Sequence, residues 1–354
     1  MSDKVIKLDI IDQKILTVLN KNSRISITEL SKFIKHHYPT VRNRINKLEE
    51  NNVIRHYYPM LQFVGIGIRR TLGIYISVKT GTLEYENLIK KFISNPYIIQ
   101  VYELDGRWNI FLLLTTNFVK EARDNMDIIK QLCGKNTQEI TAMTPFTISY
   151  LTKNFFLSFD FEVPKGKLKT GYTPLAEKAN NPFVHLTGPL KLDNIDFKIL
   201  NYLKLDANAS QEEIGKATGI SQPLVNYRLR KYLKNHLITH FGIEVNPEVL
   251  GYSLCLLVLN LGGNTKAKEE IVKQLKNDKR AYHYFEYLEY WEMVITFCVK
   301  SREEMEEIKK DIIDKYSEHI KDYDVVWVKK RKKIEPYPDI GLVYPKRLSN
   351  KSML

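Results

Sequence analysis

Two stretches of the chain, residues 8–67 and 192–251, share one pattern of apolar and polar positions. They align without a gap at a constant offset of 184 residues, which indicates an internal duplication. In each copy, apolar residues recur at helical spacing and predict a first helix with one apolar stripe. The residues of that stripe are Ile11, Ile15, Leu16 and Leu19 in the first copy, and Ile195, Ile199, Leu200 and Leu203 in the second.

A second, short helix is predicted to begin at Ser26 in the first copy and at Ser210 in the second. Glu29 and Glu213 follow three residues later. In this arrangement the hydroxyl caps the third amide of the helix, and the carboxylate returns to the amide of the capping residue. Both copies carry the same local signals, which strengthens the prediction of a helix in each.

A tight turn and a third helix follow. The second copy has Gly219 in the turn, and glycine adopts the left-handed conformation that such a turn requires. The first copy has Lys35 there, so its turn is either strained by roughly 1 kcal/mol or shaped differently. Pro39 and Pro223 stand in the first turn of the third helix, where a missing amide costs nothing. The inward positions of this helix are Val41, Ile45 and Leu48, and in the second copy Val225, Leu229 and Tyr232.

The outward face of the third helix is polar and basic, which suits entry into the major groove of DNA. Its residues are Thr40, Arg42, Asn43, Arg44, Asn46 and Lys47 in the first copy, and Asn226, Tyr227, Arg228, Arg230 and Lys231 in the second. A solvated helix face is the alternative interpretation. For Arg44 and Arg228 the alternative to DNA contact is a structural role, in which the arginine clamps the preceding turn of its helix. Each copy is therefore laid out as a winged helix-turn-helix, called a head below.

A unit of another kind follows each head, with the order βαββαβ of a ferredoxin-like sandwich. Its predicted elements are strands at 72–78, 98–104, 109–115 and 139–147 with helices at 83–94 and 118–133, and then strands at 254–261, 281–288, 292–299 and 322–328 with helices at 266–276 and 301–317. The sequence thus predicts an α+β protein in which two heads alternate with two sandwiches.

The heads resemble the DNA-binding half of the Lrp/AsnC family. The resemblance runs from the Leu-Asp-x-Ile-Asp openings at 8–12 and 192–196, through the third helix, to the starts of the wing at 53–55 and 237–239. Residues 246–252 resemble the hinge between that family's two domains, and the sandwiches resemble its ligand-sensing and dimerising domain. The resemblance implies a transcription regulator that binds double-stranded DNA, pairs through its sandwiches and responds to a small-molecule effector.

In that family a Gly-x-x-Asp turn borders the effector site. The residues at this position are Gly106, Arg107, Trp108 and Asn109 in the first copy, and Glu289, Tyr290, Trp291 and Glu292 in the second. The first copy keeps the glycine and replaces the acid by an amide, so it is the candidate effector site. The second copy lacks the glycine, so an effector held in the family's manner is not expected there. Both tryptophans are alternatively core residues.

The predicted division is head one at 1–67, sandwich one at 68–150, a linker at 151–191, head two at 192–251, sandwich two at 252–328 and a basic tail at 329–354. The net charge is +13, from 54 Lys and Arg against 41 Asp and Glu, which favours a polyanionic partner. Head one holds 11 basic and 6 acidic residues and head two 7 of each, so head one is expected to grip phosphate more strongly. The tail, with 8 basic residues against 2 acidic, is either a solubilising end or a phosphate contact.

The linker is rich in Pro, Gly and Lys, and about forty residues are long enough to let the two sandwiches meet within one chain. Sandwich one has a charge balance of +2 and sandwich two of −3. Because an apolar sheet face has to be buried, we expect these unlike sandwiches to pair face to face. Phenylalanine at 155, 156, 159 and 161 is expected to extend or cover the sheet of sandwich one.

An enzyme is the alternative function, since sirohaem decarboxylases are built from the same kinds of domain. The histidines that fall in or beside the heads are His36, His37, His56, His236 and His240. There a histidine more often contacts phosphate or fills a gap, and the sequence shows no nucleophile with a base partner and no phosphate-cradling loop. We therefore expect neither enzymatic activity nor a cofactor.

Neither a metal site nor a membrane segment is expected. Cys133, Cys255 and Cys298 are too scattered for a metal site and read as reduced core residues. No apolar run approaches the roughly 18 residues of a membrane span, and no leader is apparent. A cytoplasmic protein is expected.

Overall fold

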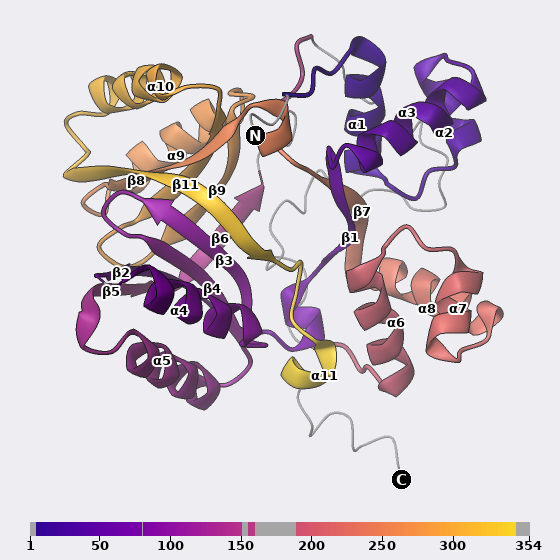
Figure 1. Cartoon of the computed structure of the whole chain (residues 1–354), viewed down its shortest axis with the longest axis horizontal. Coiled ribbons are helices and arrows are strands. Elements are labelled where there is room, and N and C mark those ends of the chain that lie inside the picture. Colours follow the sequence, from indigo (N-terminus) through magenta and orange to yellow (C-terminus); the bar gives the residue numbers. More distant parts are fainter. Residues whose placement is uncertain (1–4, 80, 151–154, 160–188, 345–354) are drawn as a thin grey trace.

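The structure is a computed structural model that describes residues 5–79, 81–150, 155–159 and 189–344, with the backbone alone at 147–150. The heads lie on one side of the molecule and the sandwiches on the other (Figure 1). The helices of the heads are α1 (Ile10–Lys21), α2 (Ile27–Ile34) and α3 (Tyr38–Glu50), and then α6 (Asn194–Leu205), α7 (Gln211–Thr218) and α8 (Gln222–Lys234).

Side-chain caps begin the first two helices of each head. Asp9 accepts hydrogen bonds from the amides of α1, and Asp193 does the same for α6, each within a complete capping box. Ser26 accepts a hydrogen bond from the Glu29 amide, and Ser210 caps α7. The predicted capping box is complete at Ser210. At Ser26 it is incomplete, because the bond from the Ser26 amide to the Glu29 carboxylate is not formed. The local signals therefore set the start of the second helix in both heads.

The turn before the third helix is left-handed in both heads. Gly219 ends α7 with φ 72°, and Lys35 ends α2 with φ 59° and ψ 48°. Of the two possibilities that the sequence left open for the first copy, the strained turn is the one observed. The predicted prolines lie in the first turns of α3 and α8, and all six predicted inward residues of these helices are buried.

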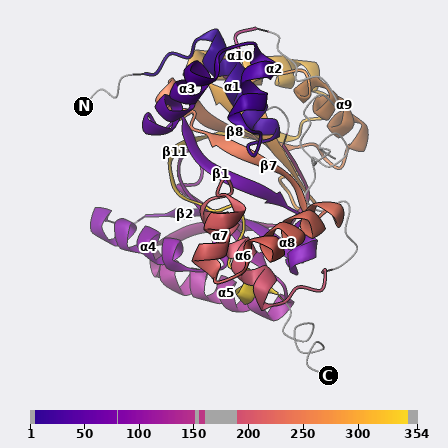
Figure 2. The ribbon, with the colours of Figure 1, turned by 90° about the vertical axis from the view of Figure 1, so that its right-hand side faces the viewer.

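The two heads are joined by a shared ribbon of two strands. Strand β1 (Ile54–Leu61) of head one pairs antiparallel with β7 (Ile238–Val245) of head two. The guanidinium of Arg24 donates to the carbonyl oxygens of Ala207 and Ala209, at 3.1 and 2.7 Å, and so ties head one to the loop before α7. In Figure 2 the heads lie above and below this ribbon. The third helices of the two heads, α3 and α8, are therefore fixed relative to each other.

Each sandwich has the order βαββαβ. Its elements are β2 (Arg70–Val78), α4 (Thr82–Ser94), β3 (Ile98–Asp105), β4 (Ile110–Thr116), α5 (Val119–Cys133) and β5 (Thr137–Met143), and then β8 (Ser253–Asn260), α9 (Thr265–Leu275), β9 (Ala281–Tyr287), β10 (Met293–Val299), α10 (Arg302–Lys315) and β11 (Asp322–Ile334). Helices α4 and α5 cover one sheet, and α9 and α10 cover the other (Figures 1 and 2). The predicted α+β fold, with two winged heads and two ferredoxin-like sandwiches, is thus confirmed.

The sandwiches exchange strands at their edges. The sheet order is β5-β2-β4-β3-β11-β8-β10-β9-β6, in which β11 pairs with β8 of its own sandwich and with β3 of the other. Strand β6 (Pro145–Tyr150) continues from β5 and pairs with β9 of sandwich two. Because β5 and β6 are neighbours in the chain and lie at opposite ends of this order, the strands curve round until the two sheets face each other.

The facing sides of the two sheets form one hydrophobic core. Tyr75 and Phe111 of sandwich one belong to the same cluster as Phe285 and Tyr287 of sandwich two. Trp108 meets Trp291 edge to face, with 6.1 Å between ring centroids. Sandwich one therefore pairs with sandwich two within one polypeptide, as the burial argument predicted.

Two expectations about strand ends need correction. The single strand predicted at 139–147 is two strands, β5 and β6, because the chain crosses from one sandwich to the other at this point. The first part of the predicted basic tail, residues 329–334, belongs to β11, and α11 (Ile340–Val343) follows it and packs beside α6. Residues 345–354 of that tail lie outside the described residues.

Phe155 and Phe156, which follow β6, do not cover sandwich one. Phe155 and Phe156 are buried in the cluster that forms the core of head one. The ring of Phe155 also packs against Tyr252 of the hinge and Tyr282 of sandwich two, with 5.1 and 6.2 Å between ring centroids. This placement follows from the crossing of β6 onto β9, while Phe161 lies outside the described residues.

Candidate nucleic-acid interface

The outward face of α3 is open to solvent. Its exposed residues are Thr40, Arg42, Asn43, Asn46 and Lys47. On α8 the side chains of Tyr227 and Arg230 are exposed, whereas Asn226 and Lys231 are half-buried. Asn226 also accepts a hydrogen bond from the amide of Gln211 at 3.3 Å. The two helices thus present polar and cationic groups of the kinds that contact phosphate and base edges.

Arg44 and Arg228 form ion pairs inside their own heads. Arg228 donates to Asp196 at 2.9 Å and to Asp193 at 2.7 Å, both at the start of α6. Arg44 pairs with the equivalent Asp9 and Asp12 of α1. Each arginine therefore ties the third helix of its head to the first, which favours the structural role that the sequence left open.

Burial and hydrogen bonding act in opposite directions on these carboxylates. Burial raises the pKa of Asp193, but the amide of Asp196 and the guanidinium of Arg228 lower the pKa more, so it lies below its ordinary value. The charged form of Asp193 is thus favoured in the folded head.

The residues of the predicted effector turn take part in internal contacts. Trp108 is fully buried, and its indole NH donates to the carboxylate of Glu139 at 3.2 Å. Arg107 pairs with the same carboxylate. The amide group of Asn109 accepts from the Val78 amide at 3.2 Å and donates to the Val78 carbonyl at 2.7 Å. Their contacts hold the β3–β4 turn in place, and an effector site there stays a prediction.

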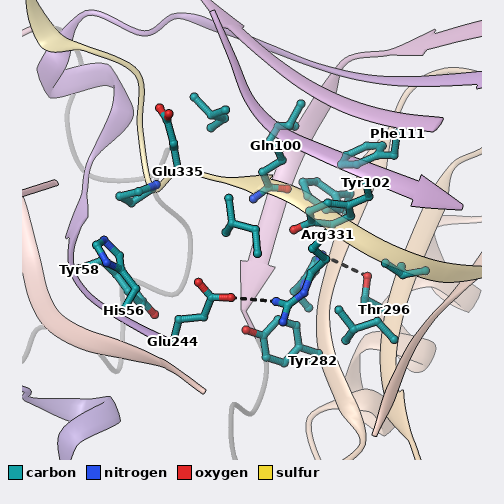
Figure 3. A pocket seen from close by; sticks show the side chains of 18 of the residues that line it. His56, Tyr58, Gln100, Tyr102, Phe111, Glu244, Tyr282, Thr296, Arg331 and Glu335 are labelled. Carbon is teal, nitrogen blue, oxygen red and sulfur yellow. Dashed lines mark hydrogen bonds and ion pairs between the residues drawn. The ribbon is translucent and has the colours of Figure 1, made fainter. Parts of the chain in front are cut away.

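A pocket lies between the paired sheets and the ribbon of the heads. Its walls come from β3, β4, β8, β9, β10 and β11, and from His56, Tyr58 and Glu244 on β1 and β7. Figure 3 shows His56 and Tyr58 on one side and Tyr102 and Phe111 on the other. The cavity volume is about 120 Å³.

An ion pair borders the pocket. The side chain of Arg331 on β11 is 3% exposed and donates to Glu244 at 2.9 Å (Figure 3). It also donates to Glu248 at 3.1 Å. Burial lowers the pKa of Arg331, but the Glu244 and Glu248 carboxylates, with Tyr102 and Tyr282, together raise the pKa more, so the guanidinium stays charged. Burial, together with the Glu244 carboxylate, raises the pKa of Tyr282 well above its ordinary range, which keeps the phenol neutral.

The sequence did not predict this pocket or the contact of Arg24 with head two. The pocket walls lie on strands from both copies, so no local spacing brings its residues together. The position of Arg24 in the second copy is occupied by Asn208, so the duplication gave no signal for that contact either.

Among the described residues no three His, Cys, Asp or Glu side chains gather as metal ligands do. In the same part of the chain, no helix has the length and apolar character needed to cross a membrane. All three cysteines are buried, and none of them forms a disulfide bond.

Comparison with known proteins matches both heads. The family model for winged helix-turn-helix DNA-binding domains matches residues 8–55 and 192–239. An uncharacterised HTH-type transcriptional regulator of Pyrococcus abyssi is 34% identical over 107 residues, which are 30% of this chain and 71% of that protein. The regulatory protein AsnC of Haemophilus influenzae is 29% identical over 114 residues, which are 32% of this chain and 75% of AsnC. Each relative thus matches about one third of the chain.

A solved structure matches the whole chain. The sirohaem decarboxylase NirDL superposes with a TM-score of 0.60, and the match covers 97% of this chain and 96% of NirDL. The two sequences are 13% identical, so the likeness is one of fold.

Proposed function

The chain belongs to the Lrp/AsnC family of winged helix-turn-helix regulators, and from this premise we propose that it is a sequence-specific transcription regulator whose two heads grip double-stranded DNA together. The residues proposed to contact DNA are Thr40, Arg42, Asn43, Asn46, Lys47, Asn226, Tyr227, Arg230 and Lys231. Arg44 and Arg228 are proposed to hold α3 and α8 in position from behind.

The observation that carries this proposal is the fixed pair of exposed recognition helices. The ribbon of β1 and β7, together with Arg24, holds the two heads against each other. A two-fold arrangement of heads matches two half-sites on DNA, which dimeric regulators obtain from two chains. Here one polypeptide supplies both heads.

The charge of the pocket argues against a sirohaem decarboxylase. Sirohaem carries carboxylates around its rim, so a site for it needs several cationic groups that are free to pair with them. Among the described residues the lining contains one arginine, Arg331, and its guanidinium is already paired with Glu244 and Glu248. Glu335 adds another carboxylate to the lining. We therefore propose that the chain is not a sirohaem decarboxylase.

An electrophoretic shift of genomic DNA fragments tests the proposal. We expect Arg42→Ala with Lys47→Ala to weaken binding more than Arg230→Ala with Lys231→Ala, because head one carries the positive balance. Lys90→Ala with Lys91→Ala removes the same charge from exposed positions of α4 and is the matched control. Equal losses in all three double variants would mean that no head directs the binding.

A visible absorbance scan with added sirohaem separates the two functions. We expect that added sirohaem gives no spectral change and no decarboxylated product, and that the DNA shift persists at moderate salt. Turnover of sirohaem by a chain that does not shift DNA would replace the regulator by the enzyme.

A further inference from the structure

The pocket between the ribbon and the paired sheets is a candidate binding site. Its volume of about 120 Å³ is roughly ten times the space that one water molecule occupies on this measure. It therefore has room for a compound of roughly ten non-hydrogen atoms, which is the size of a bicyclic ring system. The rings of Phe111, Phe285 and Tyr102 line it and offer flat apolar surfaces.

Arg331, Glu244 and Glu335 of the lining each have a partner of opposite charge. Arg331 pairs with Glu244, and Glu335 pairs with Lys204 at 2.7 Å. A charged ligand would have to displace one of these partners, and the group left behind would lose its nearest opposite charge, which costs free energy. The charge balance therefore favours a neutral ligand.

The pocket also contains uncharged polar groups. Figure 3 shows the amide of Gln100 pointing into the pocket. An amide has both donors and an acceptor, so it can pair with the edge of a heterocyclic base. On the opposite side, Thr296 and His283 form a hydrogen bond of 3.1 Å with each other.

Duplication has made the pocket asymmetric. Gln100 pairs with Leu113 across β3 and β4, and the equivalent cross-strand pair of sandwich two is His283 and Thr296. In this part of the sandwiches the offset between the copies is 183 residues, one fewer than in the heads, as between Trp108 and Trp291. At this offset Phe111 corresponds to Val294. A homodimer would present the same side chains on both sides of such a pocket. A single chain with two diverged halves instead provides one amide side and one imidazole side.

From this geometry we propose that the pocket binds a neutral bicyclic heteroaromatic compound of the size of a purine base. The aromatic walls stack against its rings, and the amide of Gln100 pairs with its edge. This site is distinct from the β3–β4 turn at 106–109.

The position of the pocket links its ligand to the heads. His56 and Tyr58 on β1 and Glu244 on β7 form part of the wall, so a bound compound contacts the ribbon that joins the heads. If the chain regulates transcription as proposed above, the ligand will change DNA affinity, and couplings of this kind amount to roughly 5-fold to 150-fold. This last step rests on the proposed function, whereas binding itself does not.

Calorimetric titration of the full chain with adenine, without DNA, tests the site. We expect adenine to bind with a micromolar dissociation constant, and Gln100→Leu to weaken it roughly fivefold to tenfold through the lost hydrogen bond. Gln138→Leu makes the same change at an exposed position of β5 and is expected to bind as the unaltered chain does. Adenosine monophosphate is expected to bind at least tenfold more weakly than adenine, because Arg331, the arginine of the described lining, is already paired with Glu244.

A second variant keeps the test independent of hydrogen bonding. Val294→Phe places in sandwich two the residue that sandwich one has at the equivalent position, and it fills the pocket. We expect it to abolish adenine binding while circular dichroism and DNA binding remain unchanged. Absence of heat from adenine at millimolar concentration would overturn the proposal, as would unchanged adenine affinity in Gln100→Leu and Val294→Phe. Failure of DNA binding with intact adenine binding would instead count against the regulator.

Discussion

At the scale of single residues, Arg228 and Arg230 stand two positions apart on α8 and have different surroundings. Arg228 pairs with Asp193 and with Asp196, whose side chain is 1% exposed. Removal of one partner from a buried pair costs about 3 kcal/mol, since it leaves an uncompensated charge. We therefore expect Arg228→Met to lower the free energy of unfolding by about that amount in urea titrations. Arg230→Met, the matched control, should change it by less than about 0.5 kcal/mol and should weaken DNA binding instead.

The same pair predicts a dependence on pH. The pKa of Asp193 lies below its ordinary value of 3.8 in the folded state. Its contribution to stability is therefore complete above that value and is lost as the pH falls through the lower folded pKa. We expect the unfolding midpoint in urea to fall between about pH 5 and about pH 3, and to fall less steeply in Arg228→Met. Parallel pH profiles for the two proteins would contradict this role of the pair.

Lys35 is a residue whose backbone conformation suits glycine. Its φ of 59° lies in the left-handed region, where a side chain costs about 1–2 kcal/mol. We expect Lys35→Gly to raise the free energy of unfolding by about 0.5–1 kcal/mol, since glycine loses part of this gain through its freedom in the unfolded chain. Lys32→Gly, within the exposed last turn of α2, should instead lower it by about 1 kcal/mol. A loss of stability in both variants would show that the turn is not strained.

At the scale of elements, a basic residue of β11 connects this strand to the heads. Arg331 is buried between β11 and the ribbon and joins the end of sandwich two to Glu244 of head two. We expect Arg331→Met to lower the urea midpoint and to expose the ribbon to proteolysis, because Glu244 loses the nearer of its two cationic partners and keeps only Arg55 at 3.5 Å among the described residues. Lys330→Met removes the neighbouring exposed charge and should do neither. If both variants behave alike, β11 does not hold the heads to the sandwiches.

The sequence predicted those elements whose causes are local, and missed those that depend on distant partners. The helices of the heads were predicted because their caps at Ser26 and Ser210 and their apolar stripes lie within a few residues of each other. The crossing of β6 to β9 and the extension of β11 along β3 depend on partners more than a hundred residues away. Backbone pairing between such distant strands leaves no periodicity in the sequence. The run of lysine and arginine in β11 was therefore predicted to be a tail.

At the scale of the whole molecule, one chain reproduces the architecture of a dimer. The βαββαβ order of each sandwich was readable from the sequence, and so was their pairing. The closure of both sheets through β6 and β11, and the pocket inside, were not readable, because both arise only when the two halves meet. The same closure fixes the ribbon of β1 and β7, and hence the distance between α3 and α8.

Hydroxyl-radical footprinting of a selected genomic fragment tests most directly whether one chain uses both heads on DNA. We expect two protected segments about 10 base pairs apart, appearing together once one chain is bound per fragment. Arg42→Ala with Lys47→Ala should weaken both segments in parallel, because the ribbon couples the heads. A second segment that appears only when a second chain binds, or no protection at all, would contradict the account.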